Sequence, residues 1–299
     1  MSAPKQAAEG RVGNRQKAPV TAAVAASLTR TANRHPLPAV LLFKRILDFQ
    51  KTEGGVLDKR GAKRYPVGAK FPIKAKITLT ARDGEGNAKP GASIDWGGQL
   101  GNLSGTGISI RLHPAAVASS GEACALKLEL DNKIFELATT VAHFKVGPQY
   151  VACGLAINFP DSYTRKAYLQ LMEPVVVGST LAPATGKVKQ DLPGLIKEQY
   201  LGESDSVLSV WRDSSGKNPK LFELVVHDYC IRGSTEMPGL NISFRDGSKS
   251  GKRASRPAIT VAITPDHQTE VKQLFQFIVQ NLGKGVPSEL RRFLELFAG

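Results

Sequence analysis

Apolar and polar residues alternate along the middle of the chain. Between Phe71 and Phe159, runs such as "FPIKAKITLTA", "ACALKLEL" and "YVACGLAINF" place an apolar residue at every second position, and turn residues separate them. A period of two is typical of a β-strand with one buried face. The pattern predicts about six strands, and an antiparallel barrel made from them would leave no exposed edge.

Helical spacing appears on both sides of this block. "HPLPAVLLFKRILDFQ" predicts an amphipathic helix within residues 35–57. "PDSYTRKAYLQLM" predicts a second helix that begins at Pro160 and Asp161 and covers the mouth of the barrel. Residues 1–34 are rich in Ala and basic residues and predict a disordered arm, because their apolar stretch is too weak for a secretory signal. An organelle transit peptide is the alternative for this arm.

The last third of the chain predicts a second β-rich domain. Residues 174–195 contain several Pro and Gly residues with little periodicity, and we interpret them as a linker. Residues 196–299 then show four strand-like segments and close with two helical ones, "PDHQTEVKQLFQFIVQNL" and "PSELRRFLELF". The predicted fold class is therefore mainly β with flanking helices: a six-stranded antiparallel barrel followed by a second β-rich domain.

Composition narrows the class of partner. The chain has 40 Lys and Arg against 26 Asp and Glu, a formal net charge of +14, which favours an anionic partner such as a nucleotide, a nucleic acid or an acidic membrane surface. No apolar run approaches the roughly 18 residues of a membrane-spanning helix. The three widely spaced cysteines indicate a reducing cytoplasm, because they fit no disulfide, metal or redox pattern.

The chain shows no sequence pattern typical of catalysis. Its five histidines are scattered, and no Ser or Cys lies in the sequence context of an activated nucleophile. "GSKSGKRAS" lacks the glycine spacing of a phosphate-binding loop. We therefore predict a binding protein without enzymatic activity and without a cofactor.

Two short polar motifs carry the most specific chemistry. Arg60 and Arg64 lie four positions apart just ahead of the first strand, and Asn102, Ser104 and Gly107 lie at the end of a later strand. Guanidinium groups bind phosphate or the O6 and N7 acceptors of guanine with two parallel hydrogen bonds. Asn offers a donor and an acceptor together, and glycine lets a ligand approach the backbone. Either motif alone is more simply a solvated linker or a turn, but together they favour a ligand with phosphates and guanines.

The two motifs in this order, R-x-x-x-R and then [D/N]-x-S-x-x-G, resemble the signature of the PilZ domain, a bacterial receptor for cyclic di-GMP. The resemblance extends through "GLAINF" at residues 154–159 and covers about residues 58–173. Family members with a basic residue before the first arginine tend to bind an intercalated ligand dimer. Lys59 occupies that position here, but it is not an arginine and leaves the stoichiometry open.

The resemblance implies a role for each motif residue. Arg60 and Arg64 would lie on a segment that moves onto the barrel when cyclic di-GMP binds, and would hold phosphate and guanine. Asn102 and Ser104 would contact guanine from the strand, and Gly107 would keep the turn open.

A second, weaker likeness lies in the C-terminal block. Asp228, Cys230 and Gly233 repeat the second motif with Cys in place of Ser, and "ITPDHQTEVKQLFQFI" is similar to "INFPDSYTRKAYLQLM". The block is shorter by about a hairpin and has no R-x-x-x-R ahead of it. It predicts a shortened PilZ-like unit that does not bind cyclic di-GMP and packs on the first domain or on a partner; chance similarity between short strands is the alternative.

Taken together, these patterns predict a cytoplasmic cyclic di-GMP effector. Ligand binding would order the arginine segment on the barrel, and the signal would pass through a domain rearrangement or a protein partner that the sequence does not identify. The alternatives are a nucleic-acid-binding protein and a PilZ-like interaction scaffold that binds no ligand. Tyr65 and Trp96 alone, near the basic residues, do not make the stacking platform of a single-strand binder.

Overall fold

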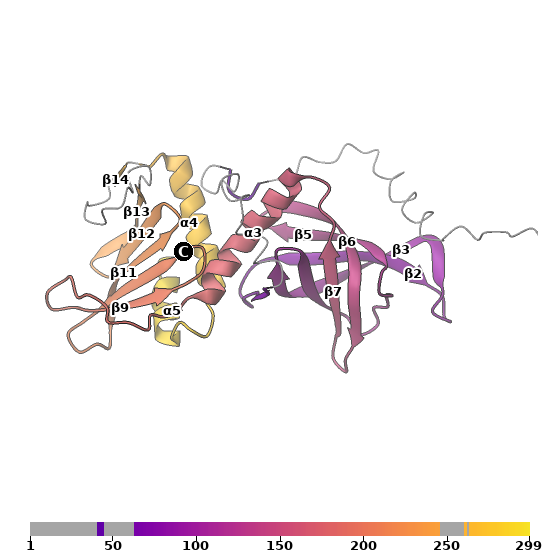
Figure 1. The fold of residues 1–299 in the computed structure, drawn as a ribbon, viewed down its shortest axis with the longest axis horizontal. Helices are drawn as coiled ribbons and strands as arrows, with labels where there is room; N and C mark the ends of the chain where they lie inside the picture. The colour runs from indigo at the N-terminus through magenta and orange to yellow at the C-terminus, as the bar shows by residue number, and fades with distance from the viewer. Residues whose placement is uncertain (1–40, 45–62, 246–259, 262) are drawn as a thin grey trace, which may run out of the picture.

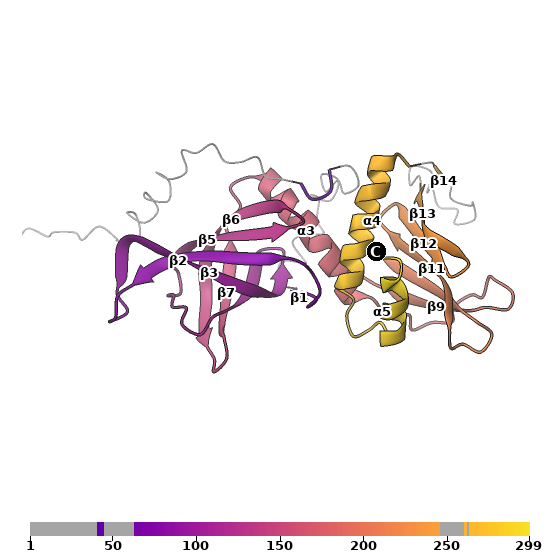
Figure 2. The ribbon, with the colours of Figure 1, turned by 180° about the vertical axis from the view of Figure 1, so that it is seen from behind.

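The computed structural model describes residues 41–44, 63–245, 260–261 and 263–299. Two β units lie at the two ends of the described structure, and the helices α3 and α4 lie between them (Figure 1). The view from behind shows the same arrangement (Figure 2). The predicted fold class, mainly β with flanking helices, is confirmed. None of the helices in the described ranges is long and apolar enough to cross a membrane.

The N-terminal unit is a ring of antiparallel strands, called the barrel below. Its strands are β2 (Lys74–Arg82), β3 (Ala88–Ser104), β4 (Gly107–Leu112), β5 (Ala123–Leu130), β6 (Lys133–Val146) and β7 (Val151–Ile157). Their pairing order is β3-β2-β5-β6-β7-β4, and β4 pairs with β3 again. The 17 residues of β3 make this possible, because its first part pairs with β2 up to Gly98 and its last part pairs with β4 from Gly98 onward.

The alternation seen in the sequence fills the inside of this ring. In β2, for example, Ala75, Ile77, Leu79 and Ala81 are buried while the residues between them are more exposed. The short strand β1 (Tyr65–Pro66) adds to the end of β3, with Tyr65 opposite Leu103.

The helix after the barrel is longer than predicted. α3 (Ser162–Thr180) begins after Asp161, whose carboxylate caps it by accepting a hydrogen bond from the Thr164 amide at 2.6 Å. Every residue from Ala167 to Gly178 is buried. The predicted linker is therefore wrong at its start, because residues 174–180 are the last turns of this helix. Pro174 indicated a break in the helix, because a proline removes one helical hydrogen bond. The burial of the three valines that follow it offsets that loss, and the helix continues.

The C-terminal unit is an open sheet with sequential strand order. It contains β8 (Ala182–Pro183), β9 (Ile196–Leu201), β10 (Val207–Arg212), β11 (Pro219–Val226), β12 (Tyr229–Ser234), β13 (Met237–Arg245) and β14 (Thr260–Val261). The helices α4 (Pro265–Gln280) and α5 (Ser288–Glu295) pack on one face of it. Phe222 of β11 stacks on Phe275 of α4 at 5.4 Å and meets Phe293 of α5 edge to face at 6.0 Å.

This topology does not support the predicted second PilZ-like copy. The barrel strands form a ring of pairings, whereas the strands described in the C-terminal unit form a meander. In the barrel, the connecting turn lies inside the motif, between Ser104 and Gly107; in the C-terminal unit, the turn at His227 and Asp228 precedes Cys230. Short alternating segments resemble one another in many β proteins, and such a likeness does not determine which strands pair.

The predicted helix within residues 35–57 is not present in its four described residues. Residues 41–44 are not helical, although Leu42 and Phe43 are buried. The Gln170 side chain binds the backbone of Phe43 on both sides, accepting from its N–H at 3.0 Å and donating to its carbonyl at 2.7 Å. These bonds take the place of helical ones. The rest of that helix and the predicted arm at residues 1–34 lie outside the described residues.

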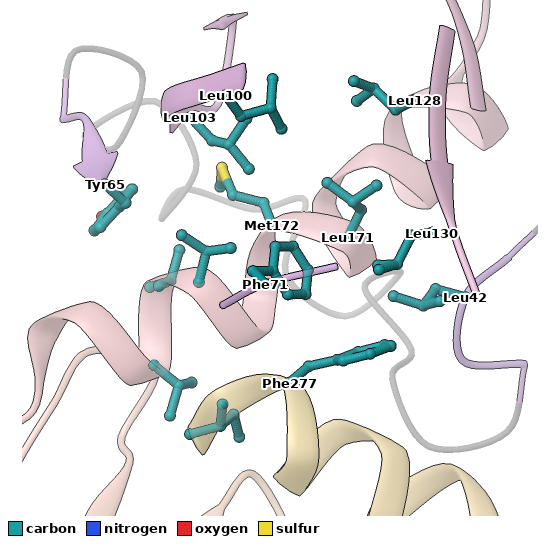
Figure 3. Packing of buried hydrophobic residues seen from close by; sticks show 14 of the residues in the cluster. Leu42, Tyr65, Phe71, Leu100, Leu103, Leu128, Leu130, Leu171, Met172 and Phe277 are labelled. Atoms are coloured by element: carbon teal, nitrogen blue, oxygen red, sulfur yellow. The ribbon is translucent and has the colours of Figure 1, made fainter. Parts of the chain in front are cut away.

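Both β units contribute to one hydrophobic core. Leu100 and Leu103 of the barrel lie on one side of α3, and Phe277 of α4 lies on the other (Figure 3). Phe71, just before β2, meets the Phe277 ring edge to face, with centroids 5.4 Å apart. Asn281 adds a polar contact by accepting a hydrogen bond from the Gly68 amide at 2.8 Å.

Candidate functional site

A small hollow on the barrel surface brings together residues from both sequence motifs. It measures about 50 Å³ and is lined by Arg64, Asn102, Ser104, Gly107, Ile108, Ser109, Ala142, His143, Gly154 and Leu155. Four of the six predicted ligand-binding residues therefore surround one point. The other two, Lys59 and Arg60, lie outside the described residues.

The ends of three strands position these side chains. Asn102 and Ser104 are at the end of β3, Gly107 begins β4, and β1 places Pro66 opposite Asn102. Arg64 is the residue just before β1, and this pairing brings it to the hollow. Antiparallel pairing between the end of β3 and the start of β4 brings the polar residues of this turn within reach of one ligand.

The turn between β3 and β4 is held from below by α3. The Ser104 hydroxyl donates to the Gly107 carbonyl at 3.1 Å. The Tyr168 hydroxyl donates to the carbonyls of Ser104 and Gly107, at 2.8 and 3.3 Å. Burial raises the pKa of Tyr168 far above its usual value, so this hydroxyl stays protonated and remains a donor. The helix thereby fixes the backbone from which Ser104 and Gly107 face a ligand.

Gly107 has a different role from the one predicted. Its φ angle is not positive, so the turn does not require a glycine for its conformation. A Cβ atom at Gly107 would instead lie 2.7 Å from the carbonyl oxygen of Leu155. Glycine is needed here because β7 passes too close for any side chain.

His143 is a site residue that the sequence pattern did not indicate. It lies in β6 opposite Gly154, and its ring covers that glycine so closely that an added Cβ would be 1.9 Å from its Cε1 atom. A β-bulge between Val141 and His143 shifts the alternation, so that Ala142 and His143 are both exposed. A histidine on a strand is usually a core or edge residue. Nothing in the local sequence predicts this bulge, so the pattern did not indicate that His143 lines a site.

The charges of the site differ from those on strands β2 and β5 of the barrel. Lysines on β2 and β5 are ion-paired, as in Lys74–Glu129 at 3.1 Å and Lys76–Asp95 at 2.7 Å. Arg64, by contrast, is exposed and has no ion pair within the described part of the chain. In the same ranges the Asn102 side chain has no hydrogen-bond partner. The hollow thus offers a guanidinium, a carboxamide and a hydroxyl to a ligand.

The side chains around the hollow can bind a phosphate or a base. A guanidinium fork binds phosphate or the Hoogsteen edge of guanine, and a carboxamide reads a base edge through a donor and an acceptor. The described residues contain no cluster of His, Cys, Asp and Glu that could hold a metal ion. Burial raises the pKa of the Cys153 thiol on β7 to about 12, so Cys153 is a core residue and not a nucleophile.

Comparison with known proteins adds a structural likeness. No family model and no curated protein sequence matches the chain. Among solved structures, the chain is similar to one described as the crystal structure of the PilZ domain of CeSA from a cellulose-synthesizing bacterium. The sequence identity is 14% and the TM-score is 0.26, over 37% of this chain and 94% of that one.

Proposed function

We propose that the chain is a cytoplasmic receptor for cyclic di-GMP, with the hollow as part of the binding site and without enzymatic activity. The observation that carries this proposal is that Arg64, Asn102 and Ser104 line the same hollow. Arg64 belongs to the first motif, and Asn102 and Ser104 belong to the second, about forty positions later. Each motif alone fits a linker or a turn. Their convergence supports a common ligand.

The groups in the hollow match the parts of this ligand. Arg64 supplies the fork for a phosphate or for the O6 and N7 atoms of a guanine, and Asn102 supplies the carboxamide for a base edge. Arg60 would supply the second fork. A hollow of about 50 Å³ admits the edge of one base, so most of the dinucleotide would lie on the outer face of the barrel. The ordered arginine segment would then pass the signal to the C-terminal unit or to a protein partner.

Isothermal titration calorimetry tests the proposal. We expect saturable binding of cyclic di-GMP and none of cyclic di-AMP, because adenine lacks the O6 acceptor. The Arg60→Ala/Arg64→Ala variant should bind at least about 100-fold more weakly, since hydrogen bonds to charged groups contribute about 1.5–3 kcal/mol each. Lys74→Ala/Lys76→Ala is the matched control: it also removes two cations, but from the ion-paired face, and it should bind like the wild type.

Two outcomes would refute the receptor. If the folded wild type does not bind cyclic di-GMP, the PilZ-like scaffold without a ligand becomes the better interpretation. If binding does not distinguish the two dinucleotides and falls steeply with salt, the basic protein is a polyelectrolyte binder and nucleic acid becomes the better ligand.

A further inference from the structure

A turn of the C-terminal sheet contacts the segment that carries Arg64. Glu203 lies between β9 and β10, and its carboxylate forms an ion pair with Lys63 and accepts a hydrogen bond from the Tyr65 hydroxyl. The Lys63 ammonium also lies 5.6 Å from the centre of the Tyr65 ring. One carboxylate from the C-terminal unit thus holds both residues that flank Arg64.

The turn that presents Glu203 is itself fixed to the end of α3. The Glu203 amide donates to the Thr180 hydroxyl at 3.0 Å, and that hydroxyl donates to the Val176 carbonyl at 2.7 Å. Within the turn, the Ser206 hydroxyl donates to the Glu203 carbonyl at 2.7 Å. The carboxylate therefore projects from a backbone that is tied to the helix between the two units.

Tyr65 connects the Glu203 turn to the barrel. Its side chain is buried, and its backbone pairs with Leu103 on β3, next to Asn102. Two residues further on, the Val67 amide donates to the Gly101 carbonyl at 3.1 Å. With Lys63 and Tyr65 both held by Glu203, the backbone of Arg64 between them has few alternatives to the position in which it lines the hollow.

We propose that Glu203 is a positioning residue for the ligand site: it keeps Arg64 at the hollow before ligand arrives, so that ligand affinity depends on the contact between the C-terminal sheet and the barrel. This inference rests on the proposed function. Its energetic basis is preorganisation, because a segment already held in place loses less conformational entropy on binding. Coupling of this kind is reciprocal, so the bound ligand also stabilises the contact at Glu203.

Affinity measurements on matched variants test the proposal. Glu203→Gln removes the charge that pairs with Lys63, and we expect it to weaken the binding of cyclic di-GMP about tenfold. In this variant roughly one more residue would have to become ordered when the ligand binds, and the entropy lost by ordering one residue corresponds to about this factor in affinity. Glu295→Gln is the control. It breaks the Lys70–Glu295 ion pair, which at 2.6 Å also joins the two units but does not flank Arg64, and it should change affinity less than about twofold.

A double-mutant cycle separates positioning from a general structural effect. If Glu203 acts through Arg64, Glu203→Gln should cause no further loss of affinity in an Arg64→Ala background. An equal loss in both backgrounds would overturn the inference. Tighter binding by Glu203→Gln would overturn it as well, because the turn would then hold Arg64 away from the ligand.

Hydrogen exchange without ligand makes the test independent of the proposed function. The Val67 amide should exchange faster in Glu203→Gln than in the wild type or in Glu295→Gln, because the loss of the Lys63 ion pair weakens the tie between the segment around β1 and the C-terminal sheet. Unchanged exchange would refute the positioning role whatever the ligand. Faster exchange in a protein that binds no cyclic di-GMP would refute the receptor and leave the role of Glu203 in fixing this segment intact.

Discussion

The shared core predicts that the two β units unfold together, and the contact between Phe71 and Phe277 is the place to test this. Both rings are buried, and each comes from a different unit. Phe277→Ala removes a ring that packs between α4 and the barrel side of the core. Truncation of a buried phenylalanine costs about 3–5 kcal/mol of stability. With a urea slope of about 2–3 kcal/mol/M, the unfolding midpoint of the C-terminal unit should fall by about 1–2.5 M.

The chain carries one natural probe in each unit. Trp96 lies in β3 of the barrel, and Trp211 is buried in β10 of the C-terminal sheet. Fluorescence of Trp96→Phe and Trp211→Phe proteins therefore reports each unit separately during urea unfolding. In the wild-type core the two transitions should coincide, as for one cooperative unit. In Phe277→Ala they should separate, because the C-terminal unit loses core that it shares with the barrel.

Phe275→Ala is the matched control. The Phe275 ring is fully buried, but it stacks on Phe222 inside the C-terminal unit. It should destabilise the protein by a similar amount while the two tryptophan transitions stay together. Separate transitions in the protein with an intact core would refute the reasoning, because the contacts between the units would then contribute too little to couple them.

Two further predictions concern α3. His227 Nε2 lies 2.9 Å from the buried carboxylate of Glu173. Burial lowers the pKa of this histidine, but the hydrogen bond to Glu173 and the charges of Glu173, Asp228 and Asp205 together raise it by more, so the pKa lies above the usual 6.5. The stability advantage of the wild type over His227→Gln should be complete below pH 6.5 and should shrink as the pH rises through the raised pKa of His227. Urea unfolding of both proteins across this pH range checks the prediction, and a difference in stability that does not change with pH would contradict it. Tyr168→Phe removes the donor to the carbonyls of Ser104 and Gly107 and should cost about 1–3 kcal/mol and weaken ligand binding. Unfolding and titration of this variant check both effects, and wild-type stability would show that the hydroxyl does not support the turn.

Local patterns predicted much of the barrel and part of the site. Alternation at period two located the six strands, and "PDSYTRKAYLQLM" located the start of α3. The residue types of the two motifs predicted that Arg64, Asn102 and Ser104 serve one ligand, and the structure places these three around one hollow. His143 was missed because the bulge that exposes it has no local signature.

Near neighbours in the chain determined where the barrel strands lie, where α3 begins and which polar groups the turns carry, because periodicity is a local property of the sequence. Tertiary structure alone decided in which order the barrel strands pair, that residues 174–180 continue a helix, and that Glu203 reaches Lys63 and Tyr65. Those partners are 140 and 138 positions away from it. Strand pairing, the burial of a helix end and the contacts between the units depend on interactions between residues that are far apart in the sequence. No short window of sequence contains both partners of such an interaction.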